Sequence, residues 1–214
     1  VPTPDCAGLP VILRGSSAEE FYAYWFNACQ NAALYQHVNP FAPGEDTGEP
    51  GKDGDVVDLR AVPYVKGSPQ SRAYDLEGMA LKVVPCIVKG KLERFTGPMK
   101  YAHYLSMPAS GSHPLFELAG GKSGKTALAK ESHLEACAFS DFYMDPTTGD
   151  FGGEIRLAYL VKDGKRSPVT GGSITGNIME NRGMIRFSSE LSDYNSCRAP
   201  ETCLVPKARI AKAE

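Results

Sequence analysis

One segment of the sequence fits a relaxed phosphate-binding pattern. Residues 119–126 read Ala-Gly-Gly-Lys-Ser-Gly-Lys-Thr, with alanine where a P-loop has its first glycine. In a P-loop, backbone N–H groups surround the phosphates, and here Lys125 would contact the β and γ oxygens while Thr126 would hold Mg²⁺. The missing glycine and the lack of alternating strand and helix patterns argue against this chemistry. A nucleotide-binding module is therefore kept only as an alternative.

The histidines and cysteines follow no local metal-binding pattern. The six cysteines include no Cys-x-x-Cys pair, and the four histidines are widely separated: His37, His103, His113 and His133. We interpret the cysteines as buried free thiols and the histidines as surface or hydrogen-bonded core residues. A site that the fold assembles from two of these histidines, His103 and His113, with a carboxylate is left open.

Two carboxylates could act as a pair. Asp75 and Glu77 are two positions apart, so an extended chain would place both side chains on the same side. Such a pair can serve in acid–base chemistry, although it more often hydrogen-bonds the backbone of a loop. The sequence contains no Gly-x-Ser-x-Gly motif, so nothing indicates a serine nucleophile elbow.

The composition indicates a folded chain that does not favour nucleic acid or a membrane as partner. With 214 residues, 42% of them hydrophobic, the chain can bury a sizeable core, and we expect one domain over residues 1–214. The net charge is −2 with both signs interspersed, which argues against a basic nucleic-acid surface. No apolar run approaches the ~18 residues of a membrane-spanning helix. We expect a cytoplasmic protein, and export of a longer parent is left open.

The N-terminal part predicts a strand followed by a core helix. Residues 11–13 form the apolar strand, and the helix should end near Leu34. Ser16 and Ser17 are each followed three residues later by a glutamate, which is capping-box spacing. Apolar residues recur at helical spacing and should face the core: Phe21, Tyr22, Trp25, Phe26, Cys29 and Ala32.

The middle of the chain alternates irregular segments with short regular elements. Residues 39–54 are rich in Pro, Gly and Asp, which predicts a long exposed loop. A Lys-Gly-Lys turn at 89–91 predicts a hairpin. Further strands are expected at 56–64, 135–142, 184–188 and 204–210, helices at 98–105 and 126–133, and a polar excursion at 189–198. This content predicts an α+β fold, a β-rich domain of antiparallel sheets with a few helices.

A hairpin pattern dominates the C-terminal half. Turn-forming residues occupy positions 145–150, and Asp-Gly at 163–164 favours a type I′ turn. A polar strand is expected around residues 173–176. Between the two turns the sequence alternates, which predicts a strand with one apolar face made of Ile155, Leu157, Tyr159 and Val161.

Several short motifs in this half occur in the order and at the distances of one protein family. They are Asp-Pro-Thr-Thr-Gly-Asp-Phe at 145–151, Asp-Gly-Lys at 163–165, Pro-Val at 168–169 and Ile-Thr-Gly-Asn-Ile at 174–178. Pro-Val-Ile-Leu at 10–13 and Tyr-Asp-Leu-Glu-Gly at 74–78 extend the similarity over nearly the whole chain. Together they resemble the C-terminal domain of the TldD/PmbA family of bacterial peptide-processing proteins. The resemblance implies that the family's N-terminal domain is absent from this chain.

The resemblance also implies where a metal would bind. In metal-bearing members, the helix after the first strand carries His-Glu-x-x-x-His, and a later Cys-Gly-Lys supplies a third zinc ligand. The corresponding positions here are Phe26, Asn27 and Asn31, and the cysteine position falls at Ser192. The chain therefore resembles the metal-free PmbA (TldE-type) branch, for which we expect no metal and no cofactor.

The resemblance implies a function that depends on partners. Metal-free members pair with a metal-bearing TldD-type subunit in a peptide-processing protease, and family members have also been labelled modulators of DNA gyrase. We expect a non-metal subunit that helps to enclose an extended peptide or unfolded protein along exposed strand edges. The alternative is an active metallopeptidase with atypical ligands, so whether the chain is itself an enzyme is left open.

Overall fold

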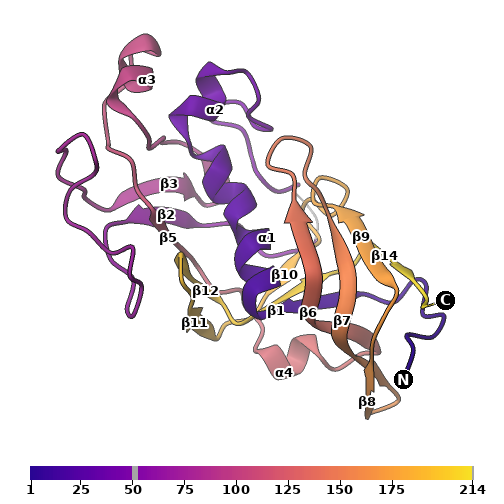
Figure 1. Ribbon diagram of the computed structural model, residues 1–214. Helices are drawn as coiled ribbons and strands as arrows, with labels where there is room; N and C mark the ends of the chain where they lie inside the picture. The colour runs from indigo at the N-terminus through magenta and orange to yellow at the C-terminus, as the bar shows by residue number, and fades with distance from the viewer. Residues whose placement is uncertain (50–52, 214) are drawn as a thin grey trace.

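The computed structural model describes residues 1–49 and 53–213. In this part of the chain, two β-sheets surround one long helix, α1 (Gly15–Ala28), and the other helices are short and peripheral (Figure 1). These are α2 (Asn31–Tyr35), α3 (Met99–Tyr104) and α4 (Lys125–Leu128). The β-rich α+β fold is confirmed. No helix among the described residues is both long and apolar enough to cross a membrane.

The larger sheet has eight strands in the order β10-β13-β1-β6-β7-β9-β14, with β8 also paired to β7. Only Pro206 and Lys207 separate β13 from β14, although these strands lie near opposite ends of that order. Because two residues span at most ~10 Å, the sheet has to curve strongly around α1. Its strands are β1 (Val11–Arg14), β6 (His133–Met144), β7 (Asp150–Lys162), β8 (Lys165–Val169), β9 (Ser173–Asn177), β10 (Arg186–Phe187), β13 (Thr202–Val205) and β14 (Ala208–Ala211).

The smaller sheet has six strands in the order β11-β12-β5-β2-β3-β4. They are β2 (Leu59–Val62), β3 (Val84–Val88), β4 (Lys91–Leu92), β5 (Leu115–Leu118), β11 (Leu191–Asp193) and β12 (Cys197–Pro200). The expectation of purely antiparallel sheets is wrong in detail, because β1 pairs with β6 and β12 with β5 in parallel. Each parallel pair joins strands far apart in the chain, as the long connection between parallel strands requires.

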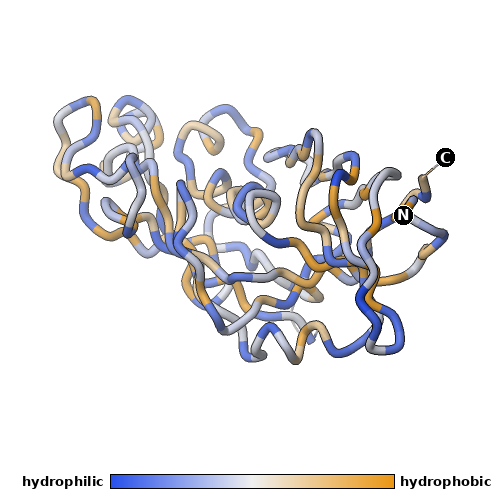
Figure 2. Tube along the Cα trace, turned by 60° about the horizontal axis from the view of Figure 1, so that its bottom comes forward, coloured by the Kyte–Doolittle hydropathy of each residue, from blue (hydrophilic) through white to orange (hydrophobic). Residues whose placement is uncertain are grey.

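Helix α1 is buried on almost every side, since it lies between the two sheets. Phe21, Tyr22 and Tyr24 are fully inaccessible, and Trp25 is 3% exposed. The Phe21 ring makes edge-to-face contacts with Trp25 and with Phe151 of β7. A helix that is apolar all round is typical of a core position. Short hydrophobic and hydrophilic stretches alternate along the chain trace, as Figure 2 shows.

The prediction of one helix that continues to Leu34 is wrong. The helix stops at Ala28, and Gln30 is extended before α2 begins. The backbone on both sides of Gln30 pairs with Thr96: the Thr96 N–H donates to Cys29 O, and the Asn31 N–H donates to Thr96 O. The long-range pairing uses the Cys29 carbonyl and the Asn31 N–H, which a continuous helix would need for its own hydrogen bonds.

The predicted capping box is also wrong. The helix begins at Gly15, and Arg14 precedes it without a side-chain cap. The Ser17 hydroxyl donates to Arg14 O, and the Glu19 carboxylate accepts from the N–H and hydroxyl of Ser196 before β12. Glu19 therefore ties the helix to the smaller sheet instead of closing its first turn.

Both predicted hairpins are confirmed, although Lys91 of the turn expected at 89–91 is already in β4. Lys89 and Gly90 join β3 to β4 with φ of 50° and 86°, and Asp163 and Gly164 join β7 to β8 with φ of 51° and 72°. Two successive positive φ angles are the type I′ signature. The strands near 56–64 and 184–188 and the helix near 98–105 are present but shorter than expected, and the strand near 135–142 is longer.

Three other boundaries differ from expectation. The helix expected at 126–133 ends at Leu128, and His133 is already in β6, which pairs with β7 from His133 and with β1 from Leu134. The closing strand at 204–210 is two strands, interrupted at Pro206, which has no N–H to donate. The polar excursion at 189–198 contains strand β11 and the start of β12.

The apolar face predicted for β7 holds only in part. Ile155 is 1% exposed, but Leu157 is 39% exposed and the next buried position is Ala158. The pairing with β6 shifts register around Cys137, which lies opposite no residue of β7. Such a β-bulge exchanges the two faces of the strands.

The segment 39–54 is less exposed than expected. Phe41 is 2% exposed, and the Arg182 guanidinium lies 5.4 Å from its ring centre. Arg182 also donates to the carbonyls of Asp46 and Gly48. These contacts anchor the described part of the loop on the larger sheet, while residues 50–52 lie outside the described residues.

Candidate functional site

The positions expected to carry metal ligands are separated by the break after α1. Phe26 stacks on Phe116 of β5 with ring centres 4.8 Å apart, and Asn27 is exposed on the same helix. Asn31 lies in α2, is 2% exposed, and donates from Nδ2 to Pro98 O. Phe26 and Asn31 therefore lie on different helices, and neither an aromatic ring nor an amide is among the side chains that zinc prefers.

The expected cysteine position does not supply a ligand either. Ser192 lies in β11 opposite Ala199. The nearest cysteine in sequence, Cys197, is fully buried and pairs with Phe116. Burial, with a smaller effect from the negative charge of Glu19, raises the pKa of Cys197 well above its ordinary value. The protonated thiol is a poor metal ligand.

The carboxylates of Asp75 and Glu77 organise backbone. Asp75 is 7% exposed and accepts the N–H groups of Glu77, Met79 and Ser112, each at 2.9 Å. Glu77 accepts the N–H of Met99 at the start of α3. The two side chains therefore bond different segments, and the loop interpretation describes them better than an acid–base pair.

The histidines divide into exposed and hydrogen-bonded core residues, as interpreted from the sequence. His37 and His103 are exposed. His113 and His133 are buried, and each has a ring nitrogen within hydrogen-bond distance of backbone carbonyls. In the described residues, no three His, Cys, Asp or Glu side chains gather closely enough to hold a metal.

The segment that fits a P-loop uses its backbone N–H groups within the protein. The N–H of Gly121 donates to Ser188 O, that of Lys122 to Asp55, and that of Lys125 to Glu190. The Lys125 ammonium is paired with Glu201 at 2.8 Å. These donors are already satisfied, so the loop does not present the phosphate cradle of a P-loop.

Most strand edges in the described residues are covered or carry protective residues. Asp55 donates its N–H to Ile185 O beside β10, and Leu92 of β4 donates to Glu45 O. The outer edge of β8 carries Lys165, Arg166 and Pro168, residue types that discourage further pairing. Strand β14 differs, because among the described strands it pairs only with β9 and it has the sequence Ala-Arg-Ile-Ala.

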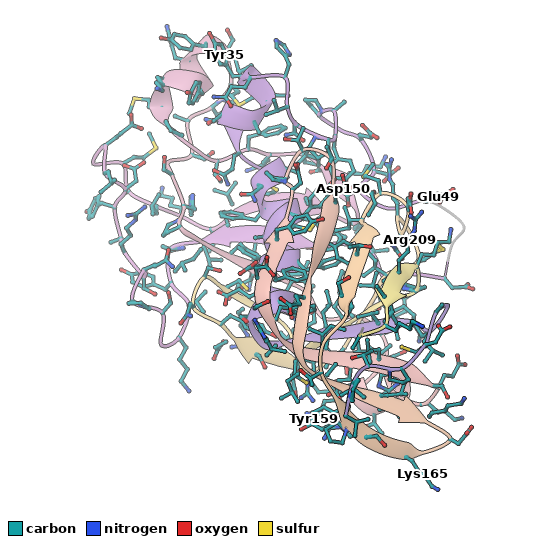
Figure 3. The ribbon with its side chains drawn as sticks, turned by 45° about the vertical axis from the view of Figure 1, so that its right-hand side comes forward. Tyr35, Glu49, Asp150, Tyr159, Lys165 and Arg209 are labelled. Carbon is teal, nitrogen blue, oxygen red and sulfur yellow. The ribbon has the colours of Figure 1, made fainter. Side chains whose placement is uncertain are left out.

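A polar groove of about 400 Å³ adjoins β14. Tyr143, Asp150, Asn177 and Arg209 line it from four neighbouring strands, and Figure 3 shows Asp150 and Arg209 at the same end of the larger sheet. Asn177 and Thr148 donate to the Asp150 carboxylate and hold its pKa below the ordinary value. The groove offers hydrogen-bond donors and acceptors, with Tyr143 as a half-exposed aromatic surface.

The comparisons with known proteins agree on one family. A family model described as the PmbA/TldA metallopeptidase C-terminal domain matches residues 7–212. The chain belongs to the PmbA/TldD family. No curated protein sequence matches it.

Solved structures of similar fold span about twice the length of this PmbA/TldD chain. A candidate modulator of a DNA gyrase from Thermotoga maritima has a TM-score of 0.78 and 18% identity, covering 95% of this chain and 49% of that one. TldE from Thermococcus kodakarensis has a TM-score of 0.75 and 17% identity, covering 97% of this chain and 50% of TldE. A candidate gyrase modulator from Bacteroides thetaiotaomicron has a TM-score of 0.73 and 19% identity, covering 97% and 47%.

The described residues of this PmbA/TldD chain do not fit the metal that the family description implies. The donor set lacks histidine, and its helical positions are divided between α1 and α2. Sequence reasoning also missed the groove beside β14. Asn177 belongs to one of the family motifs, but Tyr143 and Arg209 lie on other strands and in no motif, so only the strand pairing brings the three together.

Proposed function

We propose that this chain is the metal-free component of a TldD/PmbA-type peptide-processing protease, in which a metal-bearing TldD-type subunit performs the cleavage. The observation that carries this proposal is the expected ligand helix, where Phe26 stacks on Phe116 and the helix ends before Asn31. An aromatic stack and a buried amide supply no ligand for zinc. Cleavage therefore has to come from another chain.

The role of this component is to bind an extended peptide along β14. An added peptide strand would form main-chain hydrogen bonds with the unpaired side of this edge. Such bonds depend little on the sequence of the peptide. The groove with Tyr143 and Arg209 would contact side chains of the same peptide. β14 is favoured over β8 because its residues lack the proline and paired cations that protect the β8 edge.

The zinc content of this chain and the identity of its partner test whether a separate metal-bearing subunit performs the cleavage. After purification without added metal, we expect less than about a tenth of an equivalent of zinc, since residues 1–49 and 53–213 hold no group of three His, Cys, Asp or Glu side chains that could bind it. The native complex, isolated from source cells and sequenced by mass spectrometry, should contain a subunit with His-Glu-x-x-x-His. Stoichiometric zinc on this chain alone, or repeated isolation without such a partner, would contradict the proposal.

Strand addition at β14 predicts dependence on the peptide backbone. An unstructured fluorescent peptide should bind at least about tenfold more weakly when alternate residues are N-methylated, since methylation removes main-chain donors and keeps the side chains. Fluorescence polarisation measures both affinities. Equal binding of the two peptides would mean that the protein does not recognise the backbone.

Proline substitutions locate the edge. Along an antiparallel edge strand, successive N–H groups point alternately to the neighbouring strand and to solvent. Of Arg209→Pro and Ile210→Pro, the variant that removes the solvent-facing N–H should keep the fold and lose peptide binding. Circular dichroism identifies the folded variant. Leu191→Pro, at the edge of the smaller sheet, is the matched control and should bind normally. Unchanged binding by the folded β14 variant would rule out this edge.

A further inference from the structure

A hollow of about 530 Å³ lies on the outer face of the larger sheet. Along β1, Val11 and Leu13 belong to the main core, whereas the alternate residues Ile12 and Arg14 line the hollow. Its other walls come from α4, β6, β13 and the β7–β8 hairpin. Figure 1 shows α4 and β8 at the same end of the molecule. The hollow is separate from the groove beside β14.

The hollow is strongly positive for a chain whose net charge is −2. Four cationic side chains line it: Arg14, Lys125, Lys130 and Arg166. Glu135 is the acidic side chain in its wall, and Glu201 is ion-paired to two of the cations. Two positive charges are left without compensation. Their concentration in one concave region favours a negatively charged ligand.

The two carboxylates fix the positions of the cations. Glu135, with its side chain 10% exposed, accepts from Arg14 Nη1 at 2.5 Å and from Arg166 Nε at 3.1 Å. Glu201 accepts from Arg14 Nη2 at 3.0 Å and from Lys125 Nζ at 2.8 Å. A buried carboxylate that holds guanidinium groups in place reduces the entropy lost when they bind a ligand.

Several donors remain available around the hollow. Lys130 makes no ion pair within residues 1–49 and 53–213, and Arg166 uses only Nε there. The Arg166 guanidinium lies 3.3 Å from the ring centre of Tyr159, which holds its plane in place. Thr202 also lines the hollow, is 5% exposed, and its hydroxyl oxygen has no hydrogen-bond partner. A buried polar group without a partner is uncommon and points to a missing ligand.

We propose that this hollow binds a phosphate monoester. Two uncompensated positive charges match a phosphate group, which carries about −1.5 to −2 at neutral pH, better than a singly charged carboxylate. Guanidinium groups also match the geometry of phosphate oxygens. Recognition is by side chains, since the nearby backbone N–H groups of Gly121, Lys122 and Lys125 are bonded within the protein. Lys125 and Thr126 of the segment that resembles a P-loop line the hollow, and they would act there through their side chains.

Calorimetric titration of the full chain with phenyl phosphate at pH 8 and constant ionic strength tests this site. We expect saturable binding, weakened at least about tenfold in the double variant Lys130→Gln/Arg166→Gln. These positions are chosen because Glu135 keeps Arg14 as its partner in the variant. The matched control is Arg60→Gln/Arg198→Gln on the smaller sheet, where two exposed positive charges are also lost. The control should bind like the wild type.

Two further probes define the ligand. A phosphoserine peptide that binds more tightly than phenyl phosphate identifies a phosphorylated chain as the source, and the reverse order identifies a small phosphate ester. Sodium acetate should bind at least about tenfold more weakly than phenyl phosphate, because it carries one charge. Equal affinity for acetate, no saturable binding, or equal weakening in the control variant would overturn the proposal.

Discussion

Phe21→Ala should lower the free energy of unfolding by about 3–5 kcal/mol, the range for truncating a fully buried phenylalanine. The Phe21 side chain has no exposed surface and lies between α1 and the larger sheet. Its ring centre is 5.8 Å from that of Trp25 and 5.2 Å from that of Phe151. Truncation removes both edge-to-face contacts and leaves a cavity that rigid strands cannot fill.

Urea denaturation measures this loss through the fluorescence of Trp25, which is the single tryptophan of the chain and is 3% exposed. Leu76→Ala is the matched control. Leu76 is 92% exposed, so its removal should change stability by no more than about 0.5 kcal/mol. A loss below about 1 kcal/mol for Phe21→Ala would mean that α1 is not packed between the sheets as described.

Asp75→Ala should cost about 2–3 kcal/mol, the second largest effect that we expect. The substitution leaves the N–H groups of Glu77, Met79 and Ser112 without their acceptor. The bond to Ser112 is long-range, so its loss frees residues 74–80 from the segment that precedes β5. Glu77→Ala is the control: it removes one exposed bond to Met99 and should cost about 1 kcal/mol or less.

The same carboxylate makes stability depend on pH. Desolvation acts to raise the pKa of Asp75, but the three backbone donors and the positive charge of Arg72 outweigh it and hold the pKa below its ordinary value. A lowered folded-state pKa contributes stability that is complete above the unfolded value of about 3.9 and is lost as pH falls through the folded value. The difference between wild type and Asp75→Ala should therefore shrink between pH 6 and pH 3. A constant difference in urea titrations would show that the ionised form is not the one that is bound.

Local sequence determined the elements whose signals are short-range. The Asp163-Gly164 turn was predictable because aspartate and glycine tolerate the two positive φ angles of its hairpin, and at Lys89-Gly90 the glycine supplied the same signal. The burial of Phe21 and Trp25 followed from helical spacing. The ordered motifs of the C-terminal half were sufficient to identify the PmbA/TldD family.

Only the tertiary structure decided where helix α1 ends and which residues form a site. Nothing local predicts that Thr96 captures the backbone beside Gln30, yet this pairing places Asn31 outside the helix that carries Phe26. The pairs Arg14–Glu135 and Lys125–Glu201 likewise join residues that are distant in the chain. The physical reason is the same in both cases. Backbone and charged groups bond to the partners that strand pairing brings close, and sequence spacing does not report such partners.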